Sequence, residues 1–87
     1  MAESTFRSMD DVCAAARGMI EGAIPGARVE VTPASPGHFE IAVTAQAFAG
    51  KSLVQQQQMV YRAIAPLMAG DQAPMHAVDK LKTKAPS

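Results

Sequence analysis

The chain has 87 residues, of which 48% are apolar and 18% charged, a composition that fits one globular domain and excludes a disordered chain. Its eight basic residues balance eight acidic ones, so the basic surface that drives phosphate binding is not expected. The only local surplus, Lys80, Lys82 and Lys84, is interpreted as a solvated strand edge. No apolar run approaches the roughly 18 residues that span a bilayer, and residues 1–8 do not resemble a signal peptide, so we expect a soluble, cytoplasmic protein without membrane contact.

The first predicted helix begins at Ser8, which lies three residues before Asp11 as in a capping box, and it ends at Pro25–Gly26. Cys13 lies close to the apolar stripe of this helix, so we interpret it as a small buried hydrophobe rather than a reactive thiol. One cysteine also excludes an internal disulfide and a zinc site of paired cysteines. The stripe consists of Val12, Ala16, Met19, Ile20 and Ala23.

Two strands are predicted next. Residues 27–32 alternate apolar and polar side chains, and residues 38–44 show a similar alternation. Residues 33–37 contain two prolines, a serine and a glycine, so they are expected to form a loop. The short connection predicts an antiparallel hairpin.

A second helix is predicted to start after Ser52 and to lie across the sheet with a broad buried face. Pro66 should kink or end this helix because it lacks a backbone donor and crowds the preceding turn. A last strand is predicted over residues 75–83, with a less regular alternation in which Leu81 lies among lysines. The buried face of the helix is expected to contain Leu53, Val54, Val60, Tyr61, Ile64, Leu67 and Met68.

The predicted order of helix, strand, strand, helix, strand defines an α+β fold. A helix between the second and third strands permits those two strands, or the first and third, to run parallel. We therefore expect a mixed three-stranded sheet with the helices packed on one face. Residues 1–87 are expected to form one domain, with flexible ends at residues 1–7 and 84–87.

The two histidines are the best candidates for metal binding or acid–base chemistry near neutral pH. His38 begins the second predicted strand and His76 the third, so both side chains are expected at strand ends. The alternative is that each is an ordinary surface or capping residue. The sequence contains no recognisable nucleophile with a positioned base, no carboxylate pair in one cleft and no glycine-rich phosphate loop, so we do not expect an enzyme.

Four segments, in this order and spacing, resemble the BolA family, and among its branches the short bacterial BolA-like proteins. The resemblance extends from about Val29 to Pro86 and more loosely into the first helix. Each segment is weak evidence alone, and their order and spacing carry the match. The segments are Gly37–Val43, Phe48–Ser52, Val60–Tyr61 and Met75–Val78.

The resemblance implies a fold similar to type II KH domains and a partnership with a monothiol glutaredoxin, with roles in iron–sulfur trafficking, iron homeostasis or stress response. Such pairs share a bridging 2Fe–2S cluster, for which the glutaredoxin cysteine and glutathione supply sulfur ligands. His76 matches the family's histidine ligand, and a neutral imidazole is a competent iron ligand. In some branches of the family the second ligand is a cysteine, and Ser35 stands at that position in this chain. His38 is therefore our candidate for the second ligand in place of the cysteine.

The chain departs from the family pattern in two other places. Gln56, Gln57 and Gln58 stand where many relatives have an Arg-His-Arg segment, which removes basic side chains from the helix associated with nucleic-acid contact in KH-like folds. The stretch Asp79–Leu81 is one residue longer than usual, which predicts a β-bulge.

Two other functions remain open at this point. One is a nucleic-acid-binding transcriptional regulator with a KH-like fold, against which zero net charge and the missing Gly-x-x-Gly clamp argue. The other is an adaptor that binds a glutaredoxin without any cluster. The sequence does not decide whether the isolated protein forms a homodimer.

Overall fold

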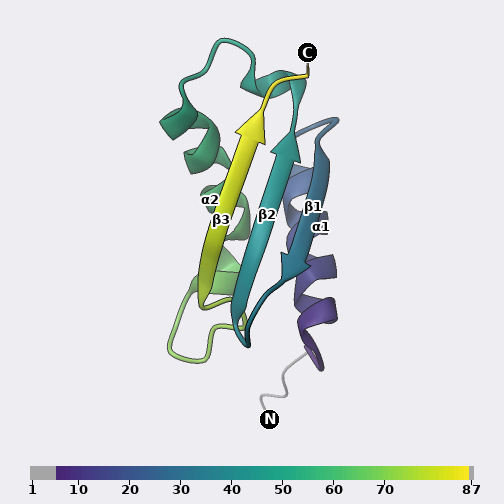
Figure 1. The fold of residues 1–87 in the computed structure, drawn as a ribbon, viewed down its shortest axis with the longest axis vertical. Helices are drawn as coiled ribbons and strands as arrows, with labels where there is room; N and C mark the ends of the chain where they lie inside the picture. The colour runs from purple at the N-terminus through teal and green to yellow at the C-terminus, as the bar shows by residue number, and fades with distance from the viewer. Residues whose placement is uncertain (1–5, 87) are drawn as a thin grey trace.

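Two helices and three strands follow one another in the predicted order in the computed structural model, which describes residues 6–86 (Figure 1). The α+β class is confirmed. Residues 1–5 and 87 lie outside the described residues, so the expectation of flexible ends is not tested there, and Lys84 is the last residue of a strand. The elements are α1 (Met9–Ala23), β1 (Arg28–Pro33), β2 (His38–Thr44), η1 (a short 3₁₀ turn, Gln46–Phe48), α2 (Leu53–Met68) and β3 (Ala77–Lys84).

The sheet has β2 at its centre, paired antiparallel with β1 and parallel with β3. Both helices lie behind the sheet in Figure 1, which leaves the other face uncovered in this view. The expected mixed sheet with helices on one face is therefore confirmed. In the part of the chain that the structure describes, no helix is both long enough and apolar enough to cross a membrane.

Serine side chains begin both helices. The Ser8 hydroxyl accepts a hydrogen bond from the Asp11 backbone N–H at 3.2 Å, which satisfies one of the free donors in the first turn of α1. Ser52 and Gln55 form a full capping box at the start of α2, with reciprocal bonds of 3.1 and 3.0 Å. Both predicted helix starts are thus fixed by local hydrogen bonds.

The hydrophobic core lies between the sheet and the two helices. Strand β2 contributes every second residue, as its alternation predicts, and Phe39 is fully buried. The core residues from the helices are Val12, Ala16 and Ile20 on α1 and Val60, Ile64 and Leu67 on α2, and those from β2 are Phe39, Ile41 and Val43.

The predicted buried face of α2 is wrong at three positions. Leu53 is 59%, Val54 63% and Tyr61 39% exposed. Figure 1 shows the first turns of α2 outside the outline of the sheet, so Leu53 has the helical spacing of the core stripe but no sheet beneath it. Val54 and Tyr61 are seven residues apart and share a different face of the helix, beside the stripe that is buried.

The element ends differ from prediction by one or two residues. Ala23 was expected in the core but is exposed. Ile24, just after the last turn of α1, is buried in its place. Helix α2 continues past Pro66 and ends at Met68. Strand β3 begins at Ala77 rather than at Met75, because Met75 is a buried core residue whose N–H donates to the Leu67 carbonyl.

The central position of Phe39 makes a direct test of this packing. We expect Phe39→Ala to lower the free energy of unfolding by about 3–5 kcal/mol, because the site loses a fully buried ring and gains a cavity. Leu53→Ala is the control, and because Leu53 is exposed it should change stability by no more than about 0.5 kcal/mol. Urea denaturation followed by circular dichroism measures both, and comparable losses would show that the start of α2 is packed in solution.

Candidate metal-ligand site

The two predicted ligand residues lie at the same end of the sheet. His38 is the first residue of β2, and His76 immediately precedes β3. The Cα partner of His38 across the parallel pair is Ala77, the neighbour of His76. The topology therefore brings together two histidines that are 38 positions apart in the sequence.

Gly37 fixes the position of His76. The carbonyl of Gly37 accepts hydrogen bonds from the backbone N–H groups of His76 at 2.8 Å and Ala77 at 3.1 Å. The imidazole packs against the Gly37 Cα so closely that a Cβ there would lie 2.9 Å from its Cγ. Gly37 also has a φ of +79°, a conformation that other residues rarely adopt. Only glycine permits both the turn and the position of the ring.

The His76 side chain is exposed at the strand end. Across residues 6–86, neither of its ring nitrogens takes part in a hydrogen bond. Within this part of the chain, both nitrogens are therefore available to an external ligand. A ring buried under core side chains would have been unable to bind iron held by another protein.

His38 has a different environment. Its side chain is 41% exposed, and its Nδ1 lies 2.8 Å from the Oδ1 of Asp79, whose side chain is also 41% exposed. The contact joins the start of β2 to β3 across 41 positions of sequence. Sequence reasoning identified His38 but not Asp79.

The predicted bulge is present and involves Asp79. Phe39 is opposite Val78, and the next residue of β2, Glu40, is opposite Lys80, so Asp79 is the extra residue in the ladder. This is a one-residue β-bulge in β3 at the end of the sheet that carries the histidines.

The residues that the structure describes contain no group of three or more His, Cys, Asp or Glu placed to hold a metal ion. Ser35 is exposed in the loop before β2, and its carbonyl accepts from the His38 N–H at 2.8 Å. Cys13 is half-buried on α1 and packs against the core, as expected. Burial, and secondarily the charge of Asp10, raises the pKa of the Cys13 thiol, so at neutral pH it is a protonated and poor ligand.

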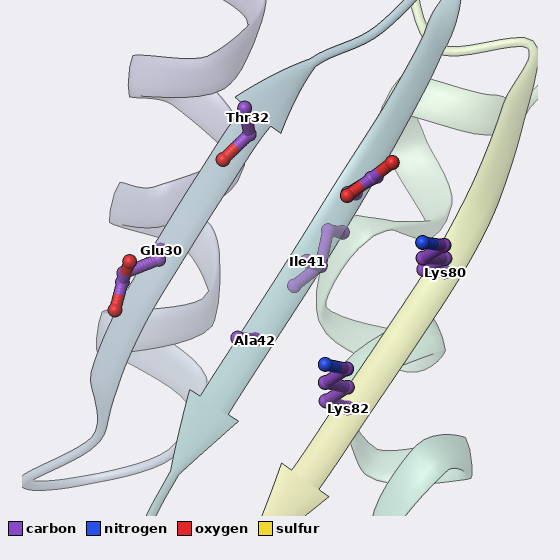
Figure 2. Close-up of a pocket in the computed structure, with 7 residues that line it drawn as sticks. Glu30, Thr32, Ile41, Ala42, Lys80 and Lys82 are labelled. Atoms are coloured by element: carbon purple, nitrogen blue, oxygen red, sulfur yellow. The ribbon is translucent and has the colours of Figure 1, made fainter.

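The open face of the sheet is charged. In Figure 2, Lys80 and Lys82 project from β3, and Glu30 and Thr32 project from β1 on the same face. The two lysines are exposed, and the Cα of Lys80 is paired with that of Glu40. A shallow depression of about 160 Å³ between these strands is smaller than the roughly 300–1,000 Å³ of an ordinary small-molecule pocket. Its lining consists of Glu30, Thr32, Glu40, Ile41, Ala42, Lys80 and Lys82.

Gln56 has a structural role that the sequence did not reveal. Its amide nitrogen donates to the carbonyls of Phe48 at 3.4 Å and Lys51 at 3.0 Å, and its amide oxygen accepts from the Thr83 hydroxyl at 2.8 Å. One side chain of α2 thereby connects the loop before the helix to β3. The signal available in the sequence, a run of four glutamines, does not distinguish this residue from its neighbours.

Comparisons with known proteins agree with this architecture. A family model described as "BolA-like protein" matches residues 22–87. The chain is similar to a bolA protein homologue from Coxiella burnetii, with 27% identity, a TM-score of 0.68 and coverage of 93% of this chain and 94% of that one. It is also similar to BolA1 from Mus musculus, with 29% identity, a TM-score of 0.68 and coverage of 99% and 72%.

The BolA domain of SufE1 from Arabidopsis thaliana shares the fold, with 24% identity, a TM-score of 0.70 and coverage of 98% of this chain and 96% of that one. The comparison with curated proteins gives no match.

Gly37 and Gly26 form a matched pair for testing the position of His76. Both have positive φ, +79° and +74°, but only a Cβ at Gly37 would meet the imidazole. We expect Gly26→Ala to cost about 1–2 kcal/mol of stability, because alanine is strained in this conformation, and Gly37→Ala to cost more, because its Cβ would also meet the ring. Only Gly37→Ala should also shift the His76 ring resonances in NMR spectra. Equal shifts in both variants would mean that the ring does not rest on Gly37.

Proposed function

The chain belongs to the BolA family, and on that premise we propose that it is a non-enzymatic partner of a monothiol glutaredoxin in iron–sulfur cluster trafficking or iron homeostasis. BolA proteins are generally non-enzymatic. In this proposal the two proteins share a bridging 2Fe–2S cluster, to which His76 contributes an imidazole nitrogen. The cluster is cargo of the complex and not a resident group of the isolated chain.

The accessibility of His76 is the observation that carries the proposal. The side chain is exposed, its backbone is held by Gly37, and across residues 6–86 its ring nitrogens take part in no hydrogen bond. A ligand for iron held by another protein needs this combination of a fixed backbone and a free nitrogen. Neutral imidazole nitrogens ligate one iron of Rieske-type 2Fe–2S centres, so the donor type is suitable.

The ligand count supports a shared cluster. A 2Fe–2S cluster takes four ligands in addition to its bridging sulfides, and two imidazoles can supply at most two of them. The glutaredoxin cysteine and glutathione would supply the thiolates, since Cys13 is a protonated, half-buried thiol. His38 is the second ligand in this proposal, because it lies at the same end of the sheet and Ser35 offers only a hydroxyl.

Removing the imidazole tests the proposal. The protein is mixed with a monothiol glutaredoxin, glutathione, iron and sulfide, and visible circular dichroism follows the formation and loss of the cluster. We expect His76→Ala to change the spectrum and to accelerate cluster loss at least about 10-fold. Gln72→Ala, in the exposed loop before β3, should behave as the wild type.

An unchanged spectrum and an unchanged rate in His76→Ala would exclude this residue as a ligand. The adaptor alternative gives a different result, since an adaptor binds apo and cluster-loaded glutaredoxin with the same affinity. A ligand donor binds the loaded form more tightly.

The second candidate function, nucleic-acid binding, is favoured by one observation. Lys80, Lys82 and Lys84 are exposed at every second position of β3, so they form one basic row. The zero net charge of the chain opposes it.

Fluorescence anisotropy with a labelled DNA at two salt concentrations decides between the two candidates. We expect no binding at physiological salt. A nucleic-acid binder would instead show a steep salt dependence, and the triple variant with Lys80, Lys82 and Lys84 changed to glutamine would reduce that slope by about three units.

A further inference from the structure

The bulge in β3 determines which side chains of that strand lie on the open face of the sheet and which point toward the helices. In a regular ladder Asp79 would stand opposite Glu40, with two carboxylates on neighbouring strands, and Lys80 would turn toward the helices. The extra residue instead puts Lys80 opposite Glu40 and Leu81 opposite Ile41. Leu81 then packs against the core and the lysines stay exposed. The bulge leaves Asp79 without a Cα partner on β2, beside His38.

The contact between Asp79 and His38 favours one tautomer of the neutral imidazole. An ionised carboxylate can only accept hydrogen bonds, so the proton in the 2.8 Å contact belongs to Nδ1 of His38. A neutral imidazole with its proton on Nδ1 carries its lone pair on Nε2. The ring orientation is fixed by the same bond, and Nε2 is the nitrogen left for a ligand.

Stability does not account for this pair. Both side chains are 41% exposed, and exposed ion pairs add little to the free energy of folding. The ion pair of Arg17 with Glu21 lies along one helix at i,i+4 spacing. Of the two acid–base side-chain pairs within residues 6–86, that of His38 and Asp79 is therefore the one that joins separate elements.

We propose that Asp79 is a positioning residue for His38, holding the imidazole in the tautomer and orientation that present Nε2 to a metal. Carboxylates that accept from the second nitrogen of a ligating histidine have this effect in metal sites generally. The inference rests on the proposed function only in taking iron as the metal that His38 binds in the complex. The tautomer and the affinity for a simple metal ion are properties of the isolated chain.

Long-range ¹H–¹⁵N NMR of the imidazoles at pH 8.5, about two units above the pKa of a model histidine, reads the tautomer directly. We expect the Nδ1-protonated form for His38 in the wild type and a shift toward the Nε2-protonated form in Asp79→Ala. Asp79→Asn, which keeps a weaker acceptor, should be intermediate. Asp71→Ala removes one carboxylate from an exposed loop and should leave the His38 spectrum unchanged.

Zn²⁺ titration of the same four proteins tests metal binding without the glutaredoxin. We expect Zn²⁺ to perturb Nε2 of His38 in the wild type, with about 10-fold weaker affinity in Asp79→Ala and no change in Asp71→Ala. A wild-type His38 protonated on Nε2, no Zn²⁺ response at His38, or equal affinities in the wild type and Asp79→Ala would each overturn the inference.

The two proposals fail separately. If the wild type passes both measurements but assembles no cluster with a glutaredoxin, the proposed function is lost and the positioning role of Asp79 stands. If the shared cluster forms while His38 has its proton on Nε2, the role of Asp79 is lost and the proposed function stands.

Discussion

The burial of β2 between two neighbouring strands and beneath two helices is the constraint on which the structure depends. Every second side chain of this strand enters the core, and its backbone pairs on both sides. Because β2 runs antiparallel to β1 and parallel to β3, its N-terminal end meets the start of β3. That meeting point holds both histidines. The site thus follows from the direction of the central strand rather than from any local motif.

The fold could be read from the sequence where a local pattern and the tertiary environment agree. The alternation in residues 38–44 and the serines at both helix starts are cases of this kind. The prediction was wrong for Leu53, because helical spacing identifies a face of a helix but not how far the sheet extends beneath it. It was wrong for Val54 and Tyr61 because they share a face beside the buried stripe. Strand β3 had an irregular pattern because its bulge changes the parity between Val78 and Leu81, both of which pack on the core.

The sequence predicted the histidines of the candidate site and the bulge beside them, but not the contacts between these residues. The histidines stood out by residue type and by their place at strand ends, and the extra residue near Asp79 stood out against the family pattern. The contact of Asp79 with His38 could not be predicted, because it depends on the register of two strands whose contacting residues are 41 positions apart. The packing of His76 on Gly37 depends on the same register, so the spacing of these two residues in the sequence does not predict it.

In the proposed complex the chain would lie beside glutathione, and the state of Cys13 has a consequence there. Thiol–disulfide exchange proceeds through the thiolate, and the partial burial of this sulfur keeps it in the unreactive form. A raised thiol pKa leaves less thiolate at Cys13 and so slows mixed-disulfide formation with a small thiol. In the proposed complex, thiol chemistry would then belong to the partner and glutathione, and this chain would contribute only nitrogen ligands to the cluster.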